Sequence, residues 1–342
     1  MKEFTEAEKQ LLIAVGWFRS RYGLMAGIAE DAEPNENNLR AFAEKWIGKY
    51  LVDWADAYRT LSERGLLKKS GRAYSLTESG QAARKALEVS HPLWLYEYDN
   101  FFSDAEKSRA HALLCERVYG LNLCQHGLAD IAQLHKLVAA LNLGAGERVL
   151  DLGCGSGLIT QYLYSLTGAA FDGIDISEEA IKRARLRTVG NERLAFRVGN
   201  MNRLDFAPQT FDALVAIDTL YYVNDLEESL RQMIAVLKTG GRMGLFFTQW
   251  INELAEAQEL LPEHTALAAL LKKYDLSFTT IDLTSDEAEH WRRKVEALEE
   301  LRPEFEKEGN TGLYEYRYSE ALRYANWDLR KRSRYLYHVR LS

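Results

Sequence analysis

The feature of this sequence that most constrains its fold is an apolar run that ends in a glycine-rich loop. Residues 148–157 read Arg-Val-Leu-Asp-Leu-Gly-Cys-Gly-Ser-Gly, and a helical pattern begins directly after them. A strand that turns through glycines into a helix is typical of an open α/β sheet, in which ligands bind beyond the carboxyl ends of the strands. Gly153 and Gly155 lack a Cβ, so the backbone can approach a ligand closely, and the helix that starts near Ser156 directs N–H groups toward it. The loop therefore predicts a ligand site.

The spacing of the glycines and the neighbouring acids narrow the ligand. The dinucleotide fingerprint requires Gly or Ala three residues after its second glycine, but Leu158 stands there and the third glycine is Gly157. A carboxylate at the mouth of the loop, Asp151, would repel a pyrophosphate and would suit a ligand that carries an ammonium and a sulfonium. S-adenosylmethionine is such a ligand. A second acid, Asp175, ends the next predicted strand about 20 residues on, where an acid accepts hydrogen bonds from ribose hydroxyls.

On these residues the sequence resembles the class I S-adenosylmethionine-dependent methyltransferases, whose first motif is similar to residues 148–157. Four later segments are similar to further motifs of the family: 171–177, the adenine-binding turn 199–202, 211–218 on the fourth strand, and the glycine turn 237–242. The resemblance implies S-adenosylmethionine as cofactor, with these contacts: Asp151, Gly153, Cys154, Gly155, Gly157, Asp175, Ile176, Asn200, Met201 and Asp218. One position departs from the family, since Asn200 stands where Asp is common. Asn keeps a hydrogen bond to the base possible but removes a charge.

Each of these residues also allows a simpler interpretation. A glycine loop after a strand is sometimes only a tight turn, but the offsets of Asp175 and of the turn at Gly199 favour a cofactor site. Cys154 could be a nucleophile, yet the family often has cysteine there without covalent chemistry, so we interpret it as a small packing residue. Asp172 lies at the start of its strand, away from the ligand edge, and is interpreted as a solvated charge.

The remainder of the chain after the loop alternates short apolar runs with helical segments, which predicts βαβ units. We expect an α/β fold with a Rossmann-like, seven-stranded, mostly parallel sheet and helices on both faces. The predicted strands are 148–152, 169–174, 194–198, 213–217, 243–247, 277–283 and 335–339. A helical insertion at about 284–330 separates the last two strands and is well placed to cover a site.

The first third of the chain has a different pattern and predicts a separate domain. A capping box at Thr5 and Glu8 opens a helix expected to reach Tyr22, and further helices are expected from Asn37 or Asn38 and from Asp53 to Arg64. Two strand-like runs around a Ser-Gly turn and another helix follow. This order resembles a winged helix, and we divide the chain into 1–104, a winged-helix-like domain for dimerisation or for covering the substrate, and 105–342, the cofactor-binding domain.

A winged helix also suggests a DNA-binding regulator that uses the cofactor fold as a ligand sensor. Residues 1–104 carry 14 Lys and Arg against 16 Asp and Glu, and the third predicted helix is not basic. The whole chain has a net charge of -7 and a pI near 5.7. Because phosphate recognition depends on accumulated positive charge, nucleic acid is disfavoured as a partner. We expect a homodimer that acts on a small molecule, and the regulator is the alternative.

Composition sets the remaining expectations. No run of about 18 apolar residues and no signal peptide are present, so no membrane partner is expected. The three cysteines have none of the short paired spacings of a zinc or redox site, which favours a reduced, cytoplasmic location and no metal.

Methyl transfer to an N, O or C nucleophile requires mainly that the acceptor be aligned with the methyl group, which can contribute about 7–11 kcal/mol. A general base is needed only if the acceptor is protonated at rest. Tyr221 and Tyr222 follow the fourth strand at its carboxyl edge, and Asp-Thr-Leu-Tyr at 218–221 lacks the Pro-Pro-aromatic sequence typical of enzymes that methylate bases. The candidates are His126 and Tyr221 for catalysis, and Gln125, Tyr222, Gln249 and Trp250 for substrate binding. For a lone histidine, and for each aromatic, packing is the alternative.

Overall fold

The structure is a computed structural model that describes residues 3–20, 22–23 and 26–341. The chain forms two compact units, Met1–Phe101 and Phe102–Ser342. The end of the first predicted helix includes Arg21, which lies outside the described residues.

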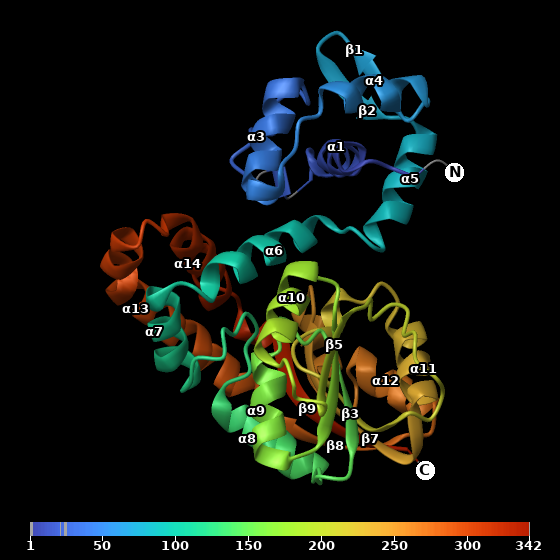
Figure 1. Ribbon diagram of the computed structural model, residues 1–342, viewed down its shortest axis with the longest axis vertical. Helices are drawn as coiled ribbons and strands as arrows, with labels where there is room; N and C mark the ends of the chain where they lie inside the picture. Colours follow the sequence, from blue (N-terminus) through green and yellow to red (C-terminus); the bar gives the residue numbers. More distant parts are fainter. Residues whose placement is uncertain (1–2, 21, 24–25, 342) are drawn as a thin grey trace. The chain divides into compact units, whose positions relative to one another are not determined.

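The first unit consists of helices and one hairpin (Figure 1). Its elements are α1 (Glu6–Trp17), α3 (Glu36–Trp46), η1 (Gly48–Tyr50), α4 (Ala55–Glu63), β1 (Leu67–Ser70), β2 (Ala73–Leu76), α5 (Glu78–Glu88) and most of α6 (Leu93–Ala105). The predicted capping box is present, since the Thr5 side chain accepts from Glu8 N and the Glu8 side chain accepts from Thr5 N. The second helix begins earlier than expected because Asn35 is its N-cap and accepts from Asn38 N.

The second unit begins with α7 (Arg109–Tyr119) and α8 (Ile131–Leu141) and then forms the predicted sheet. The strands are β3 (Arg148–Leu152), β4 (Ala170–Asp175), β5 (Leu194–Val198), β6 (Phe211–Ala216), β7 (Leu237–Trp250), β8 (Ser277–Asp282) and β9 (Arg332–Arg340). They lie in the order β5-β4-β3-β6-β7-β9-β8, and β9 runs antiparallel to both of its neighbours, β7 and β8. The Rossmann-like, seven-stranded, mostly parallel sheet is therefore confirmed.

Helices cover both faces of this sheet. On one face α8, α9 (Leu158–Thr167) and α10 (Glu178–Arg187) enclose a core that includes Val149, and on the other α11 (Leu226–Val236) and α12 (Ala266–Lys273) enclose one that includes Leu150. Figure 1 shows the two sets on opposite sides of β3. Because successive side chains of a strand alternate between faces, both residues are buried.

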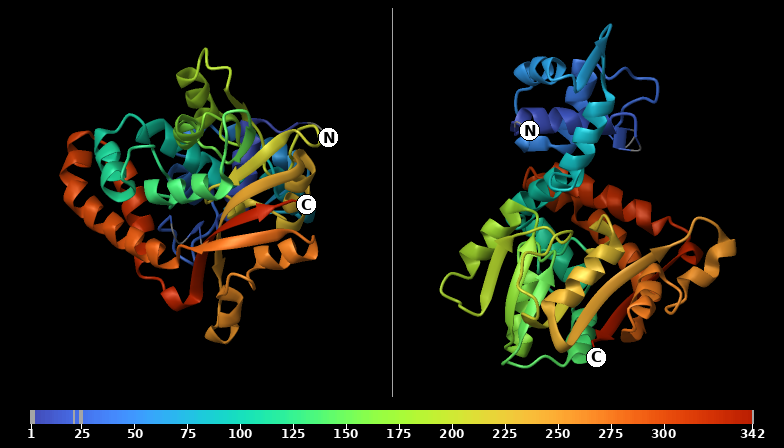
Figure 2. Two further views of the ribbon diagram at one scale, coloured as in Figure 1. Left: turned by 90° about the horizontal axis from the view of Figure 1, so that it is seen from below. Right: turned by 90° about the vertical axis from the view of Figure 1, so that its right-hand side faces the viewer.

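The structure differs from the predictions mainly in the length of two strands and in the continuity of the helical insertion. The strands β7 and β9 extend far beyond the apolar runs at 243–247 and 335–339, since they pair with each other along their polar ends as well (Figure 2). The insertion is not one helix but two, α13 (Thr284–Lys307) and α14 (Thr311–Ala325), followed by η4 (Leu329–Lys331). The break falls at Gly309, whose φ of +69° favours glycine.

Tight packing on the α9 and α10 face gives a prediction for stability. A Cβ added at Gly173 on β4 would lie 2.7 Å from the Phe196 ring and 2.8 Å from Cys154 Sγ, whereas one at Gly146 would meet nothing within 4 Å. We expect Gly173→Ala to lower the free energy of unfolding by about 1–3 kcal/mol through overpacking. Urea unfolding followed by circular dichroism measures it, with Gly146→Ala as the matched control. Equal midpoints for the two variants would contradict the packing described here.

Candidate active site

The glycine loop lies where the order of the strands reverses, because β3 is flanked by β4 on one side and β6 on the other. The N–H groups of Gly153 and Cys154 both donate to Ile174 O, at 2.8 and 3.0 Å, which fixes the loop to the end of β4. Gly153, Gly155 and Gly157 have φ values of +74°, +54° and +77°, and Gly157 is the N-cap of α9. The predicted turn into a helix is therefore present.

Close packing surrounds these glycines. A Cβ at Gly153 would lie 2.5 Å from Thr219 Cγ2, and one at Gly155 would lie 2.9 Å from Phe102 Cζ. Both positions also have the left-handed φ that L side chains rarely adopt. A larger residue at either glycine would have to displace the loop.

Asp175 ends β4 beside the loop and is half-buried. Its Oδ2 accepts from Gly155 N at 2.8 Å and its Oδ1 from Ser177 N at 2.9 Å. Burial raises the pKa of this carboxyl, and the backbone donors oppose the rise. A third backbone donor to this carboxyl is Ile176, and because an ionised carboxylate can accept about four hydrogen bonds, Asp175 retains acceptor capacity beyond these three donors. Ile176, which follows it, is also half-buried.

Asp151 has a different environment from the one expected. Its side chain is only 2% exposed, and it accepts from Thr160 Oγ1 on α9 at 2.6 Å. Burial raises its pKa to about 7. The carboxyl is thus hydrogen-bonded to α9 and is not exposed at the mouth of the loop, and its contact with a cationic ligand stays a prediction.

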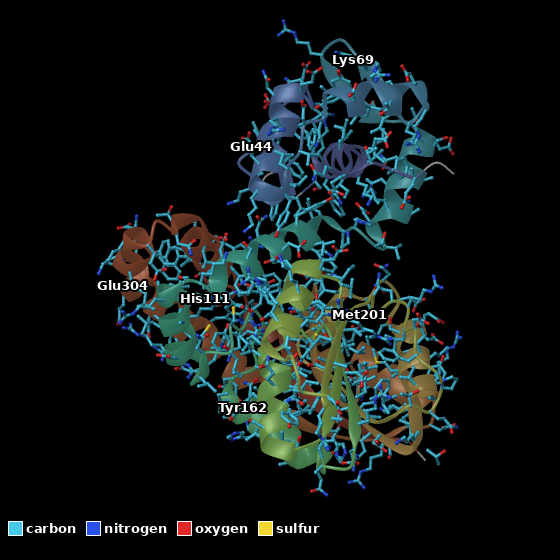
Figure 3. All side chains as sticks on the ribbon, viewed as in Figure 1. Glu44, Lys69, His111, Tyr162, Met201 and Glu304 are labelled. Atoms are coloured by element: carbon cyan, nitrogen blue, oxygen red, sulfur yellow. The ribbon has the colours of Figure 1, made fainter. Side chains whose placement is uncertain are left out.

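Three further predicted contacts lie around the loop. Cys154 is buried, and burial holds its pKa well above the ordinary thiol value, so a thiolate is disfavoured. Asn200 Oδ1 accepts from the backbone and side-chain nitrogens of Asn202, which closes the turn after β5. Met201 Cε lies 3.2 Å from where a Cβ on Gly153 would stand. Figure 3 labels Met201 near the edge of the sheet. The turn is therefore adjacent to the glycine loop.

Asp218, directly after β6, forms a buried ion pair that the sequence did not suggest. Asp218 is 4% exposed and Arg334 is fully buried. Arg334 Nε and Nη2 donate to Asp218 Oδ1 at 2.9 and 2.8 Å, and Nη2 also lies 2.9 Å from Oδ2. Oδ2 accepts from Leu128 N and Ala129 N as well, at 2.9 and 3.0 Å. These bonds give each carboxylate oxygen at least two donors, so Asp218 joins protein segments, and its contact with the cofactor stays a prediction.

The segment 125–129 is held by side chains from several elements. Arg317 on α14 donates to the backbone oxygens of Gln125 and His126, and Tyr119 on α7 donates to Gly127 O. The Gln125 amide bonds within its own loop, to Leu123 N and Leu121 O. These bonds shape the loop that presents His126, and the role of Gln125 in substrate binding stays a prediction.

His126 lies against Tyr316 of the helical insertion, with Nε2 and Oη 2.6 Å apart. Burial lowers the pKa of His126 to about 3, with the positive charge of Arg317 acting in the same direction. The imidazole is therefore neutral at pH 7. A histidine of such low basicity can orient a group by hydrogen bonding but accepts a proton poorly.

The insertion brings charged side chains to the same region. Lys294 on α13 and Arg317 on α14 are fully buried and contact Glu320 Oε2, at 2.8 and 3.1 Å. Burial acts to raise the pKa of Glu320, but Lys294 and Arg317 outweigh it and hold the pKa far below its usual range. Burial and Arg317 lower the pKa of Lys294 to about 8. Figure 2 shows α13 and α14 side by side next to α7.

Exposed aromatic residues follow β6 and β7 at the carboxyl edge. Tyr221, in η2 (Leu220–Tyr222), is 41% exposed and Trp250 is 39% exposed, with ring centroids 6.1 Å apart. Tyr222 packs against Tyr221 at 4.5 Å. Gln249 donates to Trp250 O and accepts from Ala266 N, so its amide serves the local structure. The structure brings Tyr221, Tyr222 and Trp250 together, as expected.

Several site residues were not predicted from the sequence. Thr160, Thr219, Arg334 and Tyr316 make the contacts that position predicted residues. One feature of the sequence indicates a buried partner for Arg334. The residue is charged and stands at the start of an apolar strand that must be covered on both faces, so its charge needs a buried partner. Tyr316 lies in the helical insertion, where the sequence pattern singles out no individual residue.

The second unit has a Rossmann-like sheet with a glycine loop where the order of the strands reverses, and it is similar to known proteins. Residues 143–302 match a family model described as a methyltransferase domain. The chain is 34% identical over 113 residues to methyltransferase GfsG of Streptomyces halstedii, covering 32% of this chain and 41% of that protein. It is 32% identical over 149 residues to 27-O-demethylrifamycin SV methyltransferase of Amycolatopsis mediterranei, covering 40% of this chain and 54% of that protein. The chain thus spans about half or less of the length of these curated relatives.

A solved structure shows the same fold. The phosphoethanolamine N-methyltransferase 2 of Haemonchus contortus, in complex with phosphomonomethylethanolamine and S-adenosylhomocysteine, superposes with a TM-score of 0.58 at 16% identity, over 72% of this chain and 60% of that one. The likeness to this structure shows the fold, and the match to the model of a methyltransferase domain covers residues 143–302. Among the described residues, no helix is both long and apolar enough to cross a membrane, and no three His, Cys, Asp or Glu side chains gather as metal ligands.

Buried histidines in the second unit predict a loss of stability in acid. Burial lowers the pKa of His111, His126 and His290, and within the described part of the chain both ring nitrogens of His290 lack a hydrogen-bond partner. Unfolded histidine titrates near pH 6.5, so below that pH the unfolded chain binds more protons than the folded one. The stability that the neutral buried histidines contribute is fully present above about pH 6.5. It is lost as the pH falls from there toward the lower pKa values of these histidines in the folded protein.

His290→Phe tests this directly, because Phe retains a ring against Tyr119 and Trp291 without a titrating group. At pH 5 each such histidine lowers the free energy of unfolding by about 2 kcal/mol. Between pH 7.5 and pH 5 the His290→Phe variant should therefore lose about 2 kcal/mol less stability than the wild type. Urea midpoints at the two pH values measure the difference, and His264→Phe, at an exposed position, is the control. An unchanged slope in His290→Phe would contradict the assignment.

Proposed function

We propose that the chain transfers the methyl group of S-adenosylmethionine to an N, O or C nucleophile of a small molecule and releases S-adenosylhomocysteine. The observation that carries the proposal is the loop 153–157 fixed beside the Asp175 carboxylate at the strand-order reversal. The match of residues 143–302 to a methyltransferase domain supports it.

The residues around the loop fit this cofactor. Gly153 and Gly155 would clash with their surroundings if they carried a Cβ, and Asp175 retains acceptor capacity beyond its backbone donors, which suits ribose hydroxyls. We assign Asn200 and Met201 to the adenine side, and Asp151 to an electrostatic role through Thr160. When bound, S-adenosylmethionine supplies a methyl group on a sulfonium that is already activated toward displacement.

On the acceptor side we propose that Tyr221, Tyr222 and Trp250 form an aromatic surface that aligns the acceptor. His126 and its partner Tyr316 would orient the acceptor by hydrogen bonding. Because the pKa of His126 is about 3 and that of Glu320 is strongly lowered, neither is a good proton acceptor at neutral pH. We therefore favour acceptors whose nucleophilic atom carries a lone pair without deprotonation.

For the first unit we propose a winged-helix-like fold that serves dimerisation or covers the substrate in a cytoplasmic homodimer. Its hairpin β1–β2 between α4 and α5 supports the winged-helix comparison. The alternative, a DNA-binding regulator, predicts tight duplex binding with a steep salt dependence. The net negative charge of residues 1–104 favours the enzyme.

Calorimetry with S-adenosylmethionine tests the cofactor site. Asp175→Ala removes the carboxylate that Gly155 N and Ser177 N contact, and Gly155→Val places a side chain at a φ of +54° against Phe102. Since hydrogen bonds to charged groups contribute about 1.5–3 kcal/mol, we expect Asp175→Ala to weaken binding by about tenfold to 100-fold, and Gly155→Val to weaken it at least as much.

Asp172→Ala is the matched control, because this acid lies on the same strand but pairs with Arg148 at the opposite end. It should bind like the wild type. No binding by the wild type, or full binding by both site variants, would reject the proposed site.

An activity screen across amines, phenols and carboxylates tests the acceptor side. With any acceptor that yields S-adenosylhomocysteine, we expect Tyr221→Ala to lower kcat/KM by about tenfold while the affinity for the cofactor stays the same, because the tyrosine is assigned to alignment. Tyr164→Ala, in α9, is a control for the loss of a tyrosine. Unchanged kcat/KM in Tyr221→Ala would remove this residue from the site.

A further inference from the structure

We infer that Arg334 is a positioning residue that couples the cofactor loop to the loop that presents His126, through Asp218 and its neighbour Thr219. The catalytic meaning of this coupling rests on the function proposed above, but its structural part does not.

The first observation is that several contacts hold the Arg334 guanidinium at once. Its guanidinium is fully buried, takes the Asp218 carboxylate in two parallel bonds, and donates through Nη1 to Gln133 Oε1 on α8 at 2.8 Å. Its Cζ lies 5.1 Å from the centre of the Phe246 ring. A planar fork with fixed donors orients a carboxylate in a way that a point charge does not.

The second observation is what the oriented carboxylate holds. Asp218 Oδ2 accepts from the successive amides of Leu128 and Ala129, which are two and three residues beyond His126. A Cβ on Gly127 would lie only 3.1 Å from Asp218 Cβ, so the loop passes close to this side chain. Two successive N–H groups on one oxygen fix the path of the backbone at this point.

The third observation connects the same segment to the cofactor loop. Thr219 Oγ1 donates to Leu152 O at 2.9 Å, immediately before Gly153. Thr219 Cγ2 also fills the space that a Cβ on Gly153 would occupy. The dipeptide 218–219 thus contacts both loops, and Asp218 takes a left-handed φ of +54° to do so.

Removal of Arg334 would leave the Asp218 carboxylate buried without its counter-ion, which is strongly unfavourable. The carboxyl would then have to move toward water or take up a proton. In either case the amides of Leu128 and Ala129 lose a charged acceptor and Thr219 loses a fixed neighbour. Both loops are therefore expected to loosen together.

A second buried ion pair on the same strand provides a matched control. Arg332 is two residues before Arg334 on β9, is equally buried, and pairs with Glu287 on α13 at 3.3 Å. Its bonds within the described structure go to Glu287 and to Tyr324 O, and neither of the two loops is among them. Arg332→Met should therefore destabilise the protein without acting on the loops.

The experiment is hydrogen–deuterium exchange of the full chain at the amides of Leu128 and Ala129, together with calorimetry for S-adenosylmethionine. We expect Arg334→Met to accelerate exchange at both amides by about tenfold or more and to weaken cofactor binding by about tenfold. Arg334→Lys, which keeps the charge but not the fork, should give smaller changes in the same direction. Arg332→Met should leave both measurements as in the wild type.

If Arg334→Met does not fold, Asp218→Asn replaces it, because Asn keeps the shape but cannot serve Arg334 and both amides at once. Unchanged exchange at Leu128 and Ala129 in the folded variant, or equal acceleration in Arg332→Met, would overturn the inference. Faster exchange without any cofactor binding by the wild type would instead reject the proposed function and retain the structural coupling.

Discussion

The buried ion pair between Asp218 and Arg334 is the interaction on which the arrangement of the site depends. Isolated charges are costly to bury, and here every oxygen of the carboxylate has a donor. The pair lies where the end of β6, the start of β9 and the segment 125–129 meet. The antiparallel β9 is what brings the arginine of a distant part of the chain to this point.

Around this pair the two halves of the site have different physical characters. The cofactor side is built from backbone: glycines with positive φ, N–H groups directed at Ile174 O and Asp175, and a helix that begins at the loop. The acceptor side is built from side chains of the insertion and of the loops after β6 and β7, with exposed aromatic rings and a neutral histidine. This division explains why the fold can keep one cofactor site while the acceptor site varies.

The residues proposed for the cofactor have a stronger signal in the sequence than those proposed for the acceptor, for the same reason. Strand, glycine loop and acid have fixed offsets along the chain, so the pattern of residues alone places 148–157 and Asp175 at one site. Asp151 shows what such offsets do not predict. Its position in the chain follows the pattern, but its side chain turns toward Thr160. The partners Arg334 and Tyr316 lie 116 and 190 residues from Asp218 and His126, and no local pattern encodes contacts at that separation. The helical insertion was expected as one segment, and only the backbone at Gly309 shows why it is two.

The most direct test of this account is a crystal structure of the protein with S-adenosylhomocysteine. The account predicts that both ribose hydroxyls lie within hydrogen-bond distance of the Asp175 carboxylate, that the ligand passes over Gly153 and Gly155, and that Arg334 remains paired with Asp218. A ligand bound away from Asp175, or bound with Asp218 released from Arg334 and in direct contact with the ligand, would contradict it.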